Sequence, residues 1–114
     1  MSANSAEFAE YVMAQLAPIK ALSCGRFFAG LGLACDSVQF AMLMGNALFF
    51  VVDDSTRGKF EAKGMGCFWY TTKKGRINVK KYYEVPAELL EDPETLQQWA
   101  RESITIARRL KKKK

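Results

Sequence analysis

Short apolar segments separated by turn residues predict three consecutive β-strands in the first half of the chain. The segments cover residues 26–35, 38–44 and 47–52. The pairs between them, Asp36-Ser37 and Gly45-Asn46, have the length and chemistry of tight hairpin turns. We therefore expect an antiparallel three-stranded meander around which the rest of the chain is organised.

The alternation within the middle segment indicates which of its side chains share a face. Val38, Phe40, Met42 and Met44 recur at every second position, which places these larger side chains on one side of the strand. The segment that starts at Ala47 is apolar at almost every position. This pattern favours a strand that is central or covered on both faces.

Helical spacing precedes the strands. Residues 4–18 predict a helix that Asn4 caps and Pro18 ends. Its apolar residues fall at spacings of three and four and so form one face, which we expect to cover the sheet. The members of this face are Phe8, Val12, Leu16 and Ile19.

Two further helical regions follow the meander. Residues 53–63 predict a short helix that Asp53 or Asp54 caps, and this use of two adjacent carboxylates is favoured over a metal or acid pair. Residues 86–90 predict one helical turn. Asp92 then caps a long helix, with Pro93 at its first position. We expect this last helix to lay a face containing Trp99 and Ile104 on the sheet.

A second hairpin lies between the helical regions. Residues 67–72 and 77–85 predict two strands, and residues 73–76 turn the chain between them. In the second strand we expect Ile77 and Val79, and not Asn78 and Lys80, to face the core, although Tyr82 lies an odd number of positions from them and so falls on the other face of a regular strand. A bulge before Tyr82 would restore that register.

These elements predict an α+β, two-layer fold with an antiparallel sheet of about five strands packed against helices. The expected order is a helix, a three-stranded meander, a short helix, a two-stranded hairpin and a C-terminal helix. Residues 1–114 have the size of one domain. The side chains expected to be largely buried in its core are Phe40, Leu48, Phe50, Phe60 and Trp99.

Composition narrows the class of protein. Hydrophobic residues make up 49% of the chain and charged residues 25%, which argues against global disorder. No apolar run approaches the roughly 20 residues that span a bilayer. The N-terminal residues lack the basic and apolar regions of a secretory signal. We expect a cytoplasmic protein without membrane contact.

The net charge of +5 is concentrated in two blocks, and the rest of the chain is acidic. Such blocks favour either weak contact with nucleic acid or a solvated tail and a charged, soluble sheet edge, and we prefer the second interpretation. Residues 108–114 are expected to form a flexible basic tail. The possible nucleic-acid contacts are Lys73, Lys74, Arg76, Lys80, Lys81, Arg108, Arg109, Lys111, Lys112, Lys113 and Lys114.

The residues that carry metal or nucleotide chemistry are sparse. The chain has no His, and its three cysteines are odd in number and form no CxxC pair, so we expect buried, reduced thiols and no metal. Gly30-Leu31-Gly32 lacks the third glycine of a dinucleotide-binding loop and continues into a strand. These glycines favour a bend, a bulge or a close packing contact instead.

Several short motifs, taken in order, carry a resemblance to a known family. They cover nearly the whole chain from about residue 7 and are Arg26-Phe27-Phe28-Ala29-Gly30-Leu31-Gly32-Leu33, Phe40-Ala41, Val52-Asp53-Asp54 with Thr56-Arg57 and Phe60, Gly75-Arg76, Tyr82-Tyr83-Glu84-Val85-Pro86, Leu89-Leu90-Glu91-Asp92-Pro93 and Trp99-Ala100-Arg101. In this order they resemble the N-terminal domain of the TfoX/Sxy competence regulators. Longer members of that family carry a second, C-terminal domain that these residues do not include.

The resemblance implies an α+β fold of the kind also seen in secretion chaperones, without a known catalytic site or cofactor. We therefore expect a non-enzymatic regulatory or adaptor protein that acts in competence or transcriptional regulation through protein contacts. Weak, non-specific nucleic-acid binding is the alternative. We also expect a homodimer in which a partner covers the sheet face that carries Phe49, Val51 and Trp69.

Overall fold

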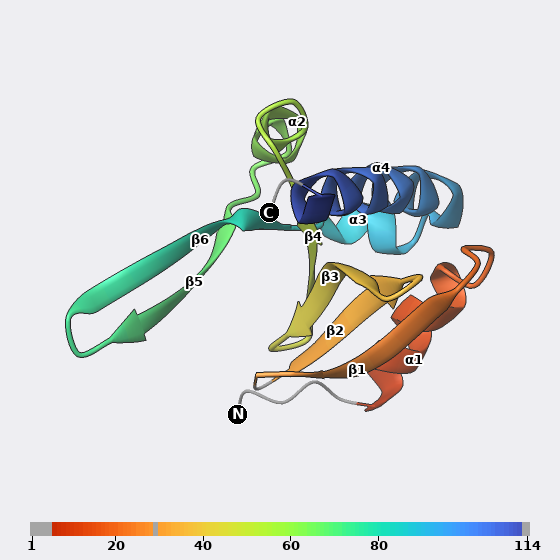
Figure 1. The fold of residues 1–114 in the computed structure, drawn as a ribbon, viewed down its shortest axis with the longest axis horizontal. Coiled ribbons are helices and arrows are strands. Elements are labelled where there is room, and N and C mark those ends of the chain that lie inside the picture. Colours follow the sequence, from red (N-terminus) through yellow and green to blue (C-terminus); the bar gives the residue numbers. More distant parts are fainter. Residues whose placement is uncertain (1–5, 29, 113–114) are drawn as a thin grey trace.

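The computed structural model describes residues 6–28 and 30–112. Within these residues, six strands form one sheet and four helices accompany it (Figure 1). The elements in chain order are α1 (Ala6–Gln15), β1 (Leu22–Phe27), β2 (Gly30–Cys35), β3 (Val38–Met44), β4 (Ala47–Val51), α2 (Arg57–Ala62), β5 (Cys67–Thr72), β6 (Gly75–Glu84), α3 (Ala87–Leu90) and α4 (Pro93–Lys112).

The sheet is antiparallel throughout, in the order β1-β2-β3-β4-β6-β5. The predicted α+β class with an antiparallel sheet is therefore confirmed. The structure differs from the prediction at residues 26–35, which we expected to form one strand. The chain reverses between Phe27 and Gly30, which are paired, so this region contributes the end of β1 and the whole of β2.

A bulge in β3 changes the faces that the alternation predicted. Leu33 pairs with Ala41 and Ala34 with Gln39, which leaves Phe40 as an extra residue. Phe40 consequently lies with the helix-facing core, and its ring is 6.0 Å from that of Phe50. Met42 pairs with Phe49 on the opposite face. The expectation that Phe40 and Met42 share a face is wrong.

The helical layer covers the face that carries Leu33, Leu43 and Leu48. Helix α4 packs on β3 and β4, and α1 and α3 pack against α4. Helix α1 ends at Gln15, before the predicted end at Pro18, but three of the four residues of the predicted apolar face are buried: Val12 on α1, and Leu16 and Ile19 in the turn after it. Phe8 is half-buried. Apolar residues at helical spacing on α4 complete the core, namely Leu96, Ala100, Ile104 and Ala107.

Four of the five predicted core side chains are buried, and the exception is Trp99. This indole is only half-buried, because it lies on the flank of α4 instead of on the sheet. It packs edge-on against Phe60, 4.7 Å between ring centroids, and the ammonium of Lys59 lies over its other side at 4.2 Å. Trp99 therefore joins α4 to α2.

Of the predicted helix caps, Asn4 lies outside the described residues, and the other two differ in outcome. Asp92 accepts hydrogen bonds from the backbone N–H and the hydroxyl of Thr95, as an N-cap does, and Pro93 begins α4. Asp53 accepts hydrogen bonds from the backbone N–H groups of Ser55 and Thr56 and so organises the turn before α2. The predicted cap at Asp92 is confirmed, whereas the predicted cap at Asp53 or Asp54 is wrong, because α2 begins only at Arg57 and its N-cap is Thr56.

The β5–β6 hairpin leaves the body of the sheet as an arm (Figure 1). Cys67 pairs with Tyr83 and Phe68 with Val79, so residues 80–82 form a bulge at the root of the arm. The bulge predicted before Tyr82 is confirmed, and it includes Tyr82 itself. Beyond it the hairpin pairs with no other strand among the described residues.

The basic C-terminal segment is mostly helical. We expected residues 108–114 to be a flexible tail, but α4 continues through Lys112. Leu110 packs against the core, and the guanidinium of Arg109 is 3.0 Å from the carboxylate of Asp53. Lys113 and Lys114 lie outside the described residues.

Candidate docking groove

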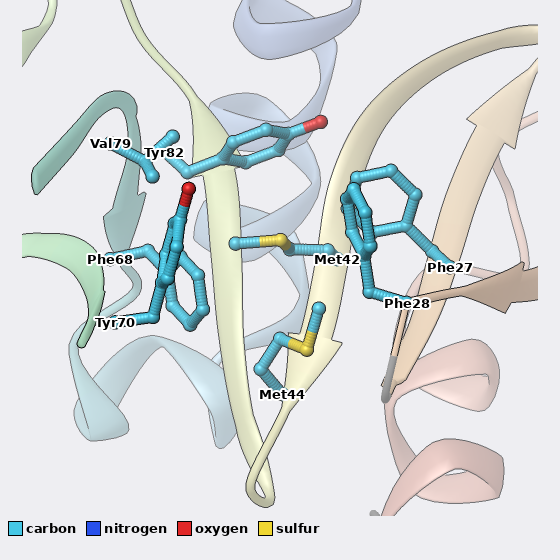
Figure 2. A pocket seen from close by; sticks show the side chains of 8 residues that line it. All are labelled: Phe27, Phe28, Met42, Met44, Phe68, Tyr70, Val79 and Tyr82. Carbon is cyan, nitrogen blue, oxygen red and sulfur yellow. The ribbon is translucent and has the colours of Figure 1, made fainter. Parts of the chain in front are cut away.

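The face of the sheet that the helices leave open forms an apolar groove (Figure 2). Its volume is about 450 Å³, within the range of ligand-binding clefts. Figure 2 shows one wall from the end of β1, a floor of methionines from β3 and a second wall from the arm. The lining residues are Phe27, Phe28, Met42, Met44, Phe68, Tyr70, Val79 and Tyr82.

Phe28 is the most unusual residue of this surface. Its side chain is 87% exposed, and its backbone has a φ of 52°, in the left-handed region. For a bulky residue this conformation is unfavourable, and turns of this kind usually contain Gly, Asn or Asp. The ring of Phe28 packs edge-on against that of Phe27, with 4.6 Å between their centroids. The fold thus bears a strained backbone and an exposed aromatic ring at one position.

The groove is chemically uniform. None of its lining side chains carries a charge at neutral pH. The phenol of Tyr82 accepts a hydrogen bond of 3.0 Å from the amide of Gln39, and burial raises the pKa of this phenol. The thioethers of Met42 and Met44 are flexible and polarizable, which suits apolar partners of varied shape. The groove therefore offers mainly apolar contact.

Sequence reasoning missed this groove. Its residues were assigned to a sheet face or to the core, and only the aromatic residues of the arm were considered as a contact surface. The local sign of the groove was the run Arg26-Phe27-Phe28, in which two aromatic residues follow a partly polar segment. That signal became informative only once the chain was seen to reverse after Phe27.

The basic residues of the arm surround its apolar face. Lys73 and Lys74 lie at the tip, and Lys80 and Lys81 lie in the bulge at the root. Arg76 stacks on Trp69 at 4.3 Å on the side away from the groove. None of these cations forms an ion pair with a carboxylate in the described part of the chain.

The second basic block lies near the root of the arm and far from its tip. Arg109 contacts Asp53, and the next residue back, Val52, donates a backbone hydrogen bond to the carbonyl of Lys81. The structure therefore brings the end of α4 close to Lys80 and Lys81. It does not bring Lys73, Lys74 or Arg76 to that place, because the arm extends away from the body (Figure 1).

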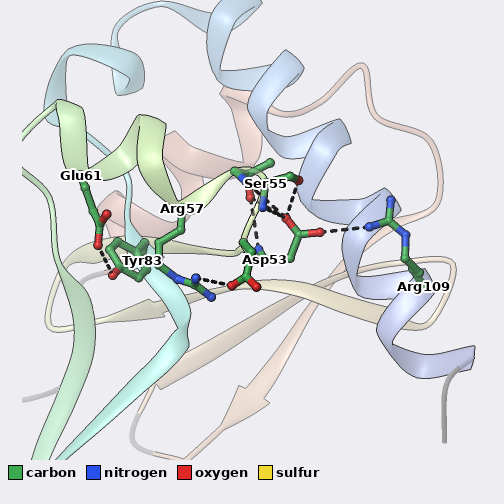
Figure 3. A network of polar contacts seen from close by, with 8 residues as sticks. Asp53, Ser55, Arg57, Glu61, Tyr83 and Arg109 are labelled. Carbon is green, nitrogen blue, oxygen red and sulfur yellow. Dashed lines mark hydrogen bonds and ion pairs between the residues drawn. The ribbon is translucent and has the colours of Figure 1, made fainter.

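A polar network joins α2, β6 and α4 (Figure 3). Hydrogen bonds from Ser55 are the main cause that lowers the pKa of Asp53, and Arg109 contributes by charge. The phenol of Tyr83 donates a 2.7 Å hydrogen bond to Glu61, which raises the pKa of Tyr83. Arg57 forms an ion pair of 2.6 Å with Asp54, and the pKa of its guanidinium is raised mainly by that hydrogen bond. These contacts secure α2 to the body.

The cysteines follow the sequence prediction only in part. All three are free thiols, but Cys35 alone is buried, whereas Cys67 is half-buried and Cys24 is exposed on β1. The described residues contain no group of three or more side chains suited to hold a metal ion. Among them there is also no helix with the length and apolarity needed to cross a membrane.

The predicted dimer face needs correction in its residues. Phe49 and Val51 are buried within the chain, and Phe49 packs edge-on against Phe68 at 5.4 Å. Trp69 is half-exposed but lies on the arm, on the side away from the groove. The open apolar surface is the groove itself, and the homodimer stays a prediction.

The glycine pair of β2 is explained by close packing. A Cβ on Gly30 would lie 2.1 Å from the carbonyl oxygen of Leu43, and one on Gly32 would lie 2.6 Å from the amide of Gln39. Only glycine fits here without displacement of the backbone or of Gln39. This confirms the predicted close packing contact.

A comparison with curated proteins finds no match. A comparison with protein families finds that residues 14–107 match the TfoX N-terminal domain. The match includes all six strands, α2 and α3, and α4 as far as Ala107, so it spans both layers of the fold. The chain therefore belongs to the TfoX N-terminal domain family.

Proposed function

We propose that this protein is a non-enzymatic, cytoplasmic adaptor that binds a segment of another protein in the apolar groove. Family membership supports a regulatory role connected with competence in general terms. Docking in the groove would give that role a physical basis, because an adaptor needs a surface that recognises a partner without transforming it. The uncharged lining and its lack of a paired nucleophile and base support this assignment.

The observation that carries the proposal is Phe28. The left-handed backbone of Phe28 costs the free protein stability, and the ring that it carries is largely exposed and has a single ring contact, with Phe27. Such a residue is expected where a partner supplies the missing contact, since exposed aromatic rings are common anchors of protein interfaces. Its position on the wall of the groove places that anchor beside Met44 and opposite Tyr70 (Figure 2).

The proposal can be tested with Phe28→Asn in the native host. Asparagine tolerates the left-handed conformation and removes the aromatic ring, so the turn is kept and the anchor is lost. A matched control is Ser37→Asn, which changes an exposed turn residue with a φ of 69° at the opposite end of β2. DNA uptake frequency is measured in the wild type, in both variants and in a strain that lacks the protein.

We expect Phe28→Asn to shift uptake to the level of the deletion at unchanged protein abundance, and Ser37→Asn to behave as the wild type. Uptake that is normal in the Phe28→Asn strain would overturn the groove as the functional site. A deletion without effect on uptake would overturn the competence role itself.

Weak nucleic-acid binding is the second candidate. The supporting observation is the proximity of Lys80 and Lys81 to the end of α4, which concentrates positive charge at one end of the body. Contacts of this kind would reach phosphates and so bind without sequence preference. A salt titration with duplex DNA separates this candidate from the adaptor role.

A further inference from the structure

We infer that the segment bound in the groove is an amphipathic α-helix with acidic flanks. This inference rests on the proposed function and specifies the partner that the same site accepts. Three observations support this inference: the backbone hydrogen bonds of the groove floor, the side chains that line the groove, and the charge of the arm beside the groove.

The backbone of the floor is already paired. Strand β6 pairs with β4 only at residues 82–84, and along the arm it pairs only with β5. The floor is strand β3, which lies between β2 and β4, so both edges of the floor are used within the sheet. A bound strand would find no N–H or C=O partners there and would bury unpaired backbone groups. A helix pairs its own backbone groups and presents only side chains. The floor therefore favours a helix over an extended segment.

The lining suits such a helix. Apolar residues at positions i, i+3, i+4 and i+7 form one stripe that fills an apolar groove. The flexible side chains of Met42 and Met44 form the floor, and the rings of Phe28 and Tyr70 stand on opposite walls (Figure 2). Tyr70 and Ile77 extend this surface along the arm, since both are only partly covered and face the same side as Phe68.

The charge of the arm selects the flanks of the helix. Between residues 67 and 83 the chain carries five cations and no acid. Lys73 and Lys74 lie at one end of the apolar surface of the arm, and Lys81 lies at the other, with its ammonium 6.0 Å from the ring of Tyr82. Carboxylates that flank the apolar stripe would meet these cations. Basic flanks would be repelled, which gives the groove a preference for one sign of charge.

The test uses three fluorescein-labelled 18-residue peptides. The first has Leu and Met at the apolar positions of a helix and Glu at the remaining ones. The second replaces every Glu by Lys, and the third keeps the acidic composition but has two central prolines that prevent helix formation. Binding is measured by fluorescence anisotropy in 0.15 M salt against the wild type, Phe28→Asn, Ser37→Asn and the double variant Lys73→Glu, Lys74→Glu.

We expect the acidic helical peptide to bind the wild type and Ser37→Asn at least about tenfold more tightly than either of the other peptides, equivalent to about 1.4 kcal/mol. Phe28→Asn should weaken its binding by a similar factor. The double charge reversal should weaken the acidic peptide and strengthen the lysine peptide. This exchange of preference would show that charge at the arm, and not the folding of the variant, sets the choice.

Three results would overturn the inference. The first is binding of the lysine peptide or of the proline-containing peptide that is as tight as binding of the acidic helix. The second is the absence of binding by any of the peptides at 100 µM, a concentration roughly a hundredfold above a micromolar Kd. The third is self-association that Phe28→Asn abolishes, seen as a light-scattering mass above 12.8 kDa in the wild type, because a second copy would then occupy the groove. Each concerns the partner class, whereas the uptake assay with Phe28→Asn tests the groove itself.

Discussion

Replacement of Phe28 by asparagine should leave the stability of the free protein almost unchanged. Because 87% of this residue is already exposed, the change removes only roughly 20–30 Å² of burial, or about 0.5–0.8 kcal/mol. The edge contact with Phe27 adds about 0.5–1.5 kcal/mol to that loss. Relief of the left-handed backbone returns about 1–2 kcal/mol, since asparagine adopts it readily. The two effects are of similar size, and we expect a net change within about 1 kcal/mol.

The variant Phe28→Ala separates the loss of side-chain contacts from the relief of backbone strain. Alanine loses the same contacts as asparagine but keeps a poorly tolerated left-handed backbone, so it should be about 1 kcal/mol less stable than Phe28→Asn. Urea unfolding at 25 °C, followed by circular dichroism, gives the free energy of unfolding and the m-value of each variant. A loss above about 2 kcal/mol in Phe28→Asn would mean that the ring supports the fold. Phe28 would then serve the stability of the free protein and would not be kept for a partner.

Three further predictions concern the core, the polar network and the basic end of α4. Phe40→Ala should lower the free energy of unfolding by about 3–5 kcal/mol, because the ring is fully buried; a melting temperature within a few degrees of wild type would contradict the helix-facing placement. Asp53 has a lowered pKa, so its stabilising contribution is present above the ordinary aspartate pKa of about 3.9 and is lost as pH falls through the folded value. Asp53→Asn should flatten this acid limb in urea titrations at several pH values, and an unchanged limb would refute the assignment. Duplex DNA should bind with a dissociation constant no tighter than about 10⁻⁴–10⁻⁶ M. Replacement of the four final lysines by glutamine should make the slope of log affinity against log salt shallower by roughly 3–4. Nanomolar, sequence-selective binding that survives this replacement would instead make the protein a DNA-recognition domain.

Sequence reasoning succeeded where the determining interactions are local. The turns Asp36-Ser37 and Gly45-Asn46, the cap at Asp92 and the second hairpin follow from residue type and spacing over a few positions. The motif order also led to the family, because motifs along a chain need no knowledge of their spatial arrangement. The bulge before Tyr82 could be predicted because apolar residues fell out of register there.

Strand β1 and the position of Phe40 depended on contacts between distant segments. The interior of β1 is exposed and partly polar, and Phe28-Ala29 carries none of the usual turn residues, so its pairing with β2 supplies what its own sequence does not indicate. Phe40 follows the alternation of its strand in the sequence, but the bulge opposite Leu33 turns it toward the helices. A single extra residue reverses the faces of a strand, and only pairing with the neighbouring strand reveals it.

The groove, likewise, could not be predicted from local sequence. Each of its residues has an ordinary local explanation as a strand residue, so composition and periodicity assign all of them to the sheet. The tertiary structure decided that the end of β1, the floor of β3 and the arm enclose one open apolar surface. The physical reason is that local sequence determines turns, caps and strand periodicity, whereas exposure of an apolar face depends on which elements are left to cover it. Here the helices cover one face of the sheet, and Phe28 remains exposed on the other.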